Sequence, residues 1–404
     1  MKTSRKVYVA LPVLNESENL PGLIESFKKQ DMKDFELVVC VNNYNRWWDE
    51  PAKVTQCADN QKSLKYLRSI DSLMVQVIDR SSPGRGWPDK KGGVGWARKI
   101  AMDEIANKAD DQDIIVSIDA DTYYPENYLS AILDYFINNP ESFGLSLPYY
   151  HKLTENATNR LILRYEIYMR YYLLNMLRID NPYAFTALGS AMAFPVWAYK
   201  KVGGLTPVKS GEDFYFLQKL IKNGHIGLWV ETIAYPSSRF SDRVLFGTGP
   251  ALIKGDRGDW DSYPIYDYRN FALIAQTFET FPQLFEQDIA TPMDTFLKVQ
   301  SKSEDLWGAL RQNYKDTENF VKACIRKVDG LRVLQFLRSE QQNKNESNEI
   351  QLAKFFNNCW SGPPVIDQEK YFQNFSFELS KAEQLNKLRN MLFEEEMRLR
   401  KDRS

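Results

Sequence analysis

Short apolar runs alternate with amphipathic stretches along the first 280 residues. Residues 7–14, 35–41 and 74–78 are rich in Val, Leu and Ile, a composition typical of strands buried on both faces. Between the first two runs, residues 20–27 place apolar side chains at helical spacing. Strands that alternate with helices in this way predict βαβ units and an α/β fold, with a mostly parallel sheet flanked by helices.

A fourth apolar run, residues 113–118, ends in two aspartates, Asp119 and Asp121. The run is β-branched and short, so we expect another buried strand. If strand geometry continues through the aspartates, their side chains at i and i+2 project to the same side and could share one divalent cation. A solvated turn is the alternative interpretation of an isolated Asp-x-Asp triplet.

The other predicted strands also end in polar residues. In a mostly parallel sheet, ligands bind beyond the carboxyl ends of the strands. We therefore expect one site at that edge, which gathers residues from three loops: Asn15, Glu16, Asn42, Asn43, Asp119 and Asp121.

Two later stretches bear on the site. The segment Gly211-Glu212-Asp213 precedes a helical pattern over 214–221, where an acidic pair suits the positive end of a helix dipole, so plain helix capping is an alternative to chemistry. Residues 161–177 predict a long helix with apolar side chains on most of its circumference. We interpret it as packed in the core or under a partner surface, with membrane contact through its arginines as the alternative.

Beyond about residue 280 the strand-like runs stop and helical periods take over, at 295–310, 317–339, 349–360 and 380–401. A polar loop is expected over 340–348. The predicted domains are thus an α/β domain over 1–280 and a mainly helical C-terminal extension over 281–404.

Composition narrows the class of protein. The 52 basic and 53 acidic residues leave a net charge of −1, which argues against a general nucleic-acid binder. The four cysteines are widely spaced and form neither a metal-ligand pattern nor a disulfide framework, so we expect reduced thiols and a cytoplasmic protein. Neither a signal peptide nor a transmembrane segment is predicted.

Five motifs in order resemble the family 2 glycosyltransferases of the GT-A fold. They are Pro12-Val13-Leu14-Asn15-Glu16, Asn42-Asn43, Gly92-Gly93-Val94-Gly95-Trp96-Ala97-Arg98, Asp119-Ala120-Asp121 and Gly211-Glu212-Asp213. The resemblance implies a Rossmann-like mixed sheet and transfer of a sugar from a nucleotide-diphosphate sugar to an acceptor hydroxyl. The acceptor would be a saccharide, a lipid-linked molecule or a small molecule. Peripheral contact with the inner face of a membrane stays open.

The resemblance also implies roles for individual residues. The nucleobase and ribose would be held by Pro12, Asn15, Glu16, Asn42 and Asn43. Gly95 and Arg98 would lie beside the nucleotide. Asp121, with Asp119, would bind Mn²⁺ or Mg²⁺ and the diphosphate, although Asp119 could instead hold the ribose. Asp213 would be the general base, and Glu212 would position the acceptor.

Other residues are candidates from their place in the chain. Arg239 and Arg243 lie where a loop often closes on the nucleotide in this fold, and surface ion pairing is the alternative for both. His225 and Asp242 are candidate third metal ligands.

Departures from the family pattern leave alternatives open. Many members carry Asp where this chain has Asn42 or Asn43, so the nucleobase is undecided. The chain lacks the Gln-x-x-Arg-Trp element of processive synthases, which argues against a chain-extruding polymerase. A retaining transferase, a nucleotidyltransferase and a nucleotide-sugar-binding scaffold remain alternatives to the inverting enzyme.

Overall fold

A computed structural model describes residues 5–154, 158–241, 247–341, 346–363 and 368–403. The chain divides into two compact units. Unit 1 comprises residues 1–162, 186–258 and 403–404, and unit 2 comprises residues 163–185 and 259–402. The chain first passes from unit 1 to unit 2 within one helix, α5 (Thr158–Arg178). The proposed domain boundary near residue 280 stays a prediction.

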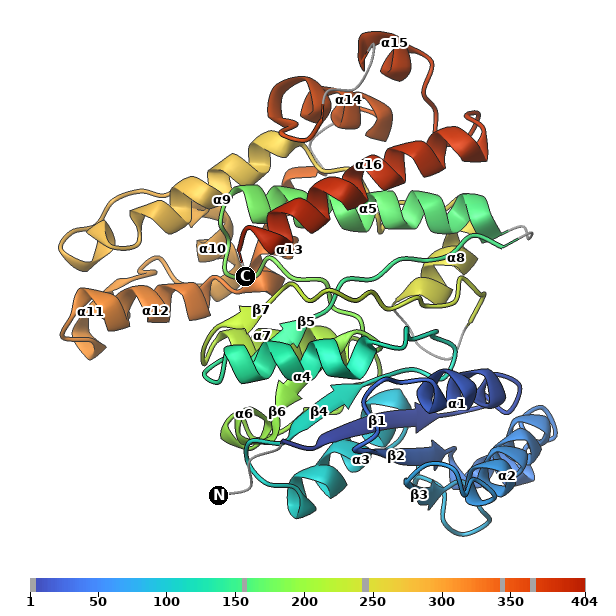
Figure 1. Ribbon diagram of the computed structural model, residues 1–404. Helices are drawn as coiled ribbons and strands as arrows, with labels where there is room; N and C mark the ends of the chain where they lie inside the picture. The colour runs from blue at the N-terminus through green and yellow to red at the C-terminus, as the bar shows by residue number, and fades with distance from the viewer. Residues whose placement is uncertain (1–4, 155–157, 242–246, 342–345, 364–367, 404) are drawn as a thin grey trace. The chain divides into compact units, whose positions relative to one another are not determined.

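Unit 1 is built on a mixed sheet that, in the described residues, has seven strands in the order β3-β2-β1-β4-β6-β5-β7 (Figure 1). β6 is antiparallel to its neighbours β4 and β5, and the other strand pairs are parallel. This confirms the expected α/β fold with a mostly parallel sheet. The strands are β1 (Val7–Val13), β2 (Phe35–Asn42), β3 (Val75–Arg80), β4 (Ile114–Ser117), β5 (Gly144–Ser146), β6 (Met192–Pro195) and β7 (Ile226–Gly227).

The central strands form the core of unit 1 because both of their faces are covered. Every residue of β1 and of β4 is buried, as their continuous apolar sequences predict. The helix α3 packs across β1 and β2. The helices of unit 1 are α1 (Leu20–Lys28), α2 (Val54–Arg68), α3 (Val94–Lys108), α4 (Tyr128–Asn138), α6 (Val196–Lys201), α7 (Glu212–Ile221) and α8 (Thr248–Asp256), with the 3₁₀ turn η1 (Asn45–Asp49).

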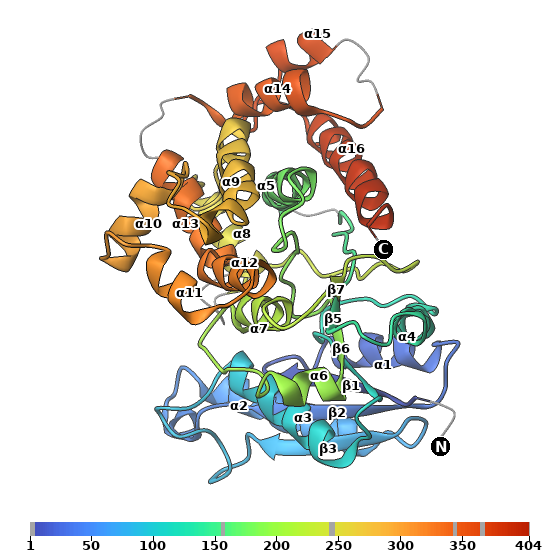
Figure 2. The ribbon, with the colours of Figure 1, turned by 90° about the vertical axis from the view of Figure 1, so that its left-hand side faces the viewer.

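The described residues of unit 2 form helices and no strand (Figure 2). The fold prediction of a helical C-terminal part is thereby confirmed. Besides most of α5, the elements are α9 (Tyr268–Thr280), η2 (Gln283–Phe285), α10 (Asp294–Ser301), α11 (Gly308–Asn313), α12 (Thr317–Lys327), α13 (Gly330–Gln341), α14 (Asn348–Cys359), α15 (Gln368–Gln373) and α16 (Ala382–Lys401).

A buried charge network joins α5 to α16, which lie side by side in both ribbon views. Arg170 pairs with Glu166 on its own helix and with Glu396 on α16, and Arg389 of α16 pairs with Glu166. These side chains are at most 1% exposed. Arg170, one of the arginines that suggested membrane contact, therefore serves helix packing inside unit 2.

Some sequence-predicted boundaries were wrong. The helix expected over 295–310 is two helices, α10 and α11, because the chain turns at Lys302, whose φ of 51° is left-handed. The helix expected over 317–339 likewise divides into α12 and α13. Helix α2 escaped prediction because its sequence is polar on most positions. Within the described part of the chain, no helix combines the length and apolar character needed to cross a bilayer.

Candidate active site at the carboxyl edge of the sheet

Three parallel strands end at one edge of the sheet, and the loops beyond them carry the predicted site residues. β1 lies between β2 and β4 and is parallel to both. The carboxyl ends of the three strands therefore meet at the same edge. In chain order, the polar residues at these ends are Asn15, Glu16, Asn42, Asn43, Asp119 and Asp121.

The two aspartates do not continue a strand. β4 ends at Ser117, and the chain turns through Asp119 and Asp121. Strand geometry therefore does not place the two carboxylates on one side. Each aspartate instead pairs with a different arginine: Asp119 with Arg98 and Asp121 with Arg239.

Arg98 is the buried centre of the site. It projects from α3, is 2% exposed, and donates from Nη2 to Asp119 at 2.9 Å and from Nε to Glu212 at 3.2 Å. Asp119 follows β4, whereas Glu212 begins α7, more than ninety residues further along the chain. A single guanidinium therefore brings together the two acidic pairs that the sequence singled out.

The backbone around Arg98 is shaped to fit it. Nη1 donates to the carbonyl of Gly189 at 2.9 Å and to the hydroxyl of Ser117, which itself donates to the Gly189 carbonyl at 2.6 Å. A Cβ at position 189 would collide with the guanidinium, so only glycine permits this close approach. Gly95, one turn earlier on α3, similarly leaves room for the backbone of Val208.

Glu212 and Asp213 open α7, and burial raises the pKa of both carboxyl groups. For Glu212, burial and the neighbouring Asp213 raise the pKa to about 7 against the attraction of Arg98. For Asp213, burial raises the pKa, while Arg98 and the backbone N–H of Phe214, 2.8 Å from Oδ1, oppose the shift. Glu212 is 4% exposed, whereas Asp213 is partly exposed and so the more accessible of the two.

Arg239 joins the other half of the site. Its Nε donates to Asp121 at 2.7 Å, and its Nη2 pairs with Glu16 in the loop after β1. Glu16 is nearly buried, and the side chain of Arg239 is 32% exposed. Nearby Asp121 and Glu16 raise the pKa of the arginine, despite its partial burial, and thereby keep it charged.

The site carries a formal excess of negative charge. Two guanidinium groups, from Arg98 and Arg239, pair with four carboxylates, from Glu16, Asp119, Asp121 and Glu212. Asp213 adds a fifth carboxylate, attracted by Arg98, which leaves three negative charges if all ionise. Such an excess favours the binding of a further cation.

The asparagines at the edge hold loops together. Asn42 donates to the carbonyl of Val13 at 2.9 Å and accepts from the indole N–H of Trp87 at 3.0 Å. Asn43 accepts from Asn60 at 2.9 Å. Both are at most 2% exposed, so in this conformation their amides serve the protein's own backbone and side chains.

Asn60, on α2, is a site residue that sequence reasoning missed. It donates to the carbonyl of Asn42 at 3.0 Å and accepts from the backbone N–H of Asn15 at 2.9 Å. Asn15 has a φ of 56°, a conformation that asparagine adopts more readily than most residues. Only the burial of Asn60 distinguishes it from the other polar residues of α2, and burial cannot be predicted from so polar a sequence.

Other candidates lie elsewhere. Pro12 is inside β1 and buried. Arg243 and Asp242 fall outside the described residues. His225 immediately precedes β7, which is parallel to β5, so it stands at the opposite end of the sheet from Asp121. It is therefore excluded as a third ligand beside Asp121.

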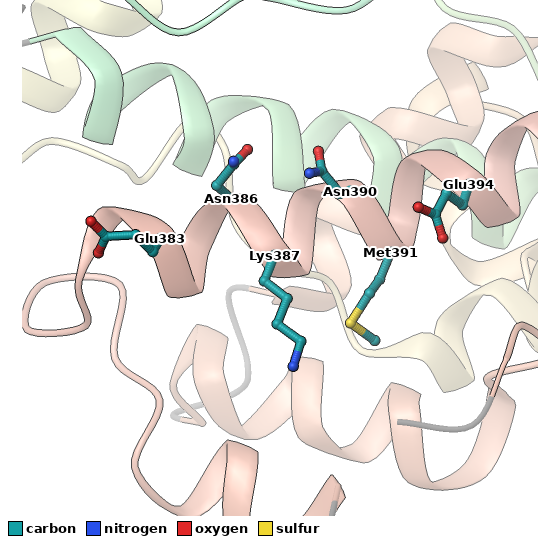
Figure 3. Close-up of a pocket in the computed structure, with 6 residues that line it drawn as sticks. All are labelled: Glu383, Asn386, Lys387, Asn390, Met391 and Glu394. Carbon is teal, nitrogen blue, oxygen red and sulfur yellow. The ribbon is translucent and has the colours of Figure 1, made fainter. Parts of the chain in front are cut away.

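The described residues contain no group of three or more His, Cys, Asp or Glu side chains placed to hold a metal ion by themselves. A shallow, open pocket lies in unit 2 along one face of α16 (Figure 3). Its side chains do not form a group suited to acid–base catalysis. Its lining residues, which Figure 3 labels, are Glu383, Asn386, Lys387, Asn390, Met391 and Glu394. We assign no chemistry to it.

Comparison with known proteins gives a partial likeness. No family model and no curated protein matches the chain. Among solved structures, S. aureus TarS residues 1–349 in complex with UDP-GlcNAc is 15% identical, with a TM-score of 0.42 over 90% of this chain and 95% of that one. The mannosyltransferase PcManGT from Pyrobaculum calidifontis, in complex with GDP-Man and Mn²⁺, is 14% identical, with a TM-score of 0.41 over 85% and 89%.

GalNAc-T7 with UDP, GalNAc and Mn²⁺ is 11% identical, with a TM-score of 0.38 over 80% of this chain and 57% of that one. Sequence identities and TM-scores this low support no conclusion about activity. The function proposed below therefore rests on the residues of this chain.

Proposed function

We propose that the chain is a family 2-like glycosyltransferase of the GT-A fold, which transfers a sugar from a nucleotide-diphosphate sugar to an acceptor hydroxyl with inversion. The observation that carries the proposal is the meeting of two distant acidic pairs at Arg98, through Asp119 and Glu212. Sugar transfer needs positive charge beside the departing diphosphate and a base for the acceptor. Arg239 and a divalent cation attracted by the excess of carboxylates would supply the first, and a carboxylate at the start of α7 would supply the second.

The donor half of the proposal uses the loops after β1, β2 and β4. Glu16 and the segment around Asn43 would receive the nucleoside, and Arg239 would contact the diphosphate. Asp121 and Asp119 suit Mn²⁺ or Mg²⁺, since such ions are commonly held by one or two carboxylates together with phosphate oxygens and water. A bound divalent ion would neutralise charge on the diphosphate.

The acceptor half uses the start of α7. Asp213 is the base in this proposal because it is more accessible than Glu212 and its raised pKa makes its carboxylate a better proton acceptor. Glu212 is engaged by Arg98 and would orient the acceptor. As the acceptor oxygen bonds to C1 of the sugar, its proton passes to Asp213 and the C1–O bond to the diphosphate breaks.

The test is a panel of nucleotide-diphosphate sugars assayed for hydrolysis and for thermal stabilisation, with and without Mn²⁺. Asp213→Asn should retain donor binding and lose turnover by about 10²-fold or more, as expected for removal of a general base. Asp134→Asn, the same change at an exposed position on α4, is the matched control. Proton NMR of the first-formed product reports the anomeric configuration.

The outcomes separate the alternatives. Retention of configuration would replace the inverting mechanism with a retaining one. Stabilisation by nucleotide sugars without any turnover would favour a binding scaffold. Full turnover by Asp213→Asn would show that another group is the base.

A further inference from the structure

Three tyrosines and one lysine form a partly exposed cluster beyond the sheet edge, here called the tyrosine platform: Tyr123, Tyr150, Tyr235 and Lys152. The ring centroids of Tyr123 and Tyr235 are 6.0 Å apart, and those of Tyr150 and Tyr235 are 6.5 Å apart. Tyr123 is 49% exposed. By contrast, the adjacent Tyr124 is 1% exposed and packs in the core. Core packing does not account for the exposed ring of Tyr123.

The backbone holds the platform rigidly. Tyr123 and Tyr235 exchange two hydrogen bonds, each N–H donating to the other's carbonyl at 3.0 Å. The N–H of Tyr150 donates to the carbonyl of Ala234 at 2.9 Å. The rings thus project from three segments that are already paired. A preorganised aromatic surface binds a ligand with little loss of conformational entropy.

The platform adjoins the proposed transfer site. Tyr123 lies two residues after Asp121, within about 7 Å along the backbone. Tyr235 lies four residues before Arg239, and Arg239 pairs with Asp121. Two segments therefore each contribute one residue to the site and one ring to the platform.

Sheet order places the platform away from the nucleoside side. Its tyrosines follow β4, β5 and β7, whereas the residues proposed to hold the nucleoside follow β1 and β2. The aspartates after β4 separate the two groups of loops. A ligand on the platform would therefore approach the sugar from the side opposite to the nucleoside, which is where an acceptor must enter.

Lys152 adds a charge to this surface. Its ammonium lies 4.6 Å from the ring centroid of Tyr123 and 4.2 Å from that of Tyr235, and the side chain is exposed. Among the described residues, no carboxylate lies within ion-pairing distance of it. Cation–π contacts at exposed sites are weak, so a negatively charged group can draw the ammonium off the rings.

We propose that the tyrosine platform is the acceptor subsite and that it takes a sugar ring carrying an anionic group, either phosphate or carboxylate. This inference rests on the proposed sugar transfer. The apolar C–H face of the sugar stacks on Tyr123 and Tyr235, and Lys152 pairs with the anion.

The test measures binding by the full chain, using saturation-transfer NMR with three probes: methyl glucoside, glucose 6-phosphate and glucuronate. Saturation should reach the ring protons of all three, and the two anionic sugars should bind about fivefold more tightly than the neutral one. The phosphate and carboxylate arms identify which anion is preferred.

Variants assign the effect to the platform. Lys152→Gln should abolish the preference for anionic sugars. Tyr123→Ala should weaken binding of all three probes about fivefold or more, whereas Tyr123→Phe should retain it because the ring remains. Tyr66→Ala, at a half-buried tyrosine on α2, is the control and should leave binding unchanged.

The inference is overturned if no probe binds, if the neutral and anionic sugars bind equally, or if Lys152→Gln and Tyr123→Ala bind like the wild type. Hydrolysis of nucleotide sugars by the wild type is measured separately. Failure of that reaction defeats the proposed function, whereas normal hydrolysis with unaltered sugar binding in the variants defeats the acceptor subsite alone.

Discussion

Replacing Arg98 with methionine keeps most of the side-chain volume but removes the cation that joins the two acidic pairs. Glu212 would lose the 3.2 Å ion pair in a position where its side chain is 5% exposed, and Asp119 would lose the 2.9 Å pair at 36% exposure. Removing one member of a buried pair is destabilising by about 3–5 kcal/mol, whereas an exposed pair contributes about 1 kcal/mol or less. The buried partner thus dominates the expected effect.

The pH sets an upper limit to that effect, because a carboxylate without its partner can take up a proton. With Arg98 in place, the pKa of Glu212 is already raised to about 7, so protonating the folded carboxylate costs about 1.4 kcal/mol at about pH 8 and almost nothing at about pH 5.5. We therefore expect Arg98→Met to lower the free energy of unfolding by about 1–2.5 kcal/mol at the higher pH, from Glu212 and the more exposed Asp119 together, and by about 1 kcal/mol or less at the lower.

Urea unfolding at the two pH values measures this difference. Lys99→Met is the matched control, since Lys99 is the next residue on α3 and forms a partly exposed pair with Asp103. It should change the free energy of unfolding by no more than about 1 kcal/mol at either pH. Equal destabilisation by Arg98→Met at both pH values would instead show that the loss comes from packing rather than from uncompensated charge.

Three further predictions follow from the same site. The folded-state pKa of Glu212 is raised to about 7 from 4.5, so its contribution to stability is full below pH 4.5 and is lost as the pH rises through about 7. Glu212→Gln should therefore flatten the pH profile of the melting temperature between these two values. An unaltered profile would contradict the raised pKa. Gly189→Ala should destabilise by about 1–3 kcal/mol in urea because the added methyl group meets Arg98, whereas Gly22→Ala, in open space on α1, should stabilise by up to about 1 kcal/mol. Arg239→Gln removes a cation that would compete with Mn²⁺ for the carboxylates, so Mn²⁺ affinity measured by EPR should rise about fivefold or more. Weaker Mn²⁺ binding by this variant would mean that the arginine does not compete with the ion.

The apolar pattern predicted the strands on which the site is built. β1, β2 and β4 are short, mostly apolar and almost entirely buried, and each is followed by polar residues, so the sequence alone placed Glu16, Asn43 and Asp119 at strand ends. It could not predict the strand order of the second half, because β6 is antiparallel and the two strands beyond it in the sheet, β5 and β7, are only three and two residues long. Strands this short leave too little periodicity to read.

The order of amino acids was enough to predict the local chemistry: an α/β chain with acidic pairs at two positions and a helical C-terminal part. Which groups meet was decided by the tertiary structure alone. Arg98 reaches Asp119 and Glu212, and Asn60 reaches the loops after β1 and β2, because crossovers of the chain bring separate segments to one edge of the sheet. The physical reason is that ion pairs and amide hydrogen bonds act over about 3 Å, a distance that depends on the packing of elements far apart in the chain and leaves no periodic trace in the sequence.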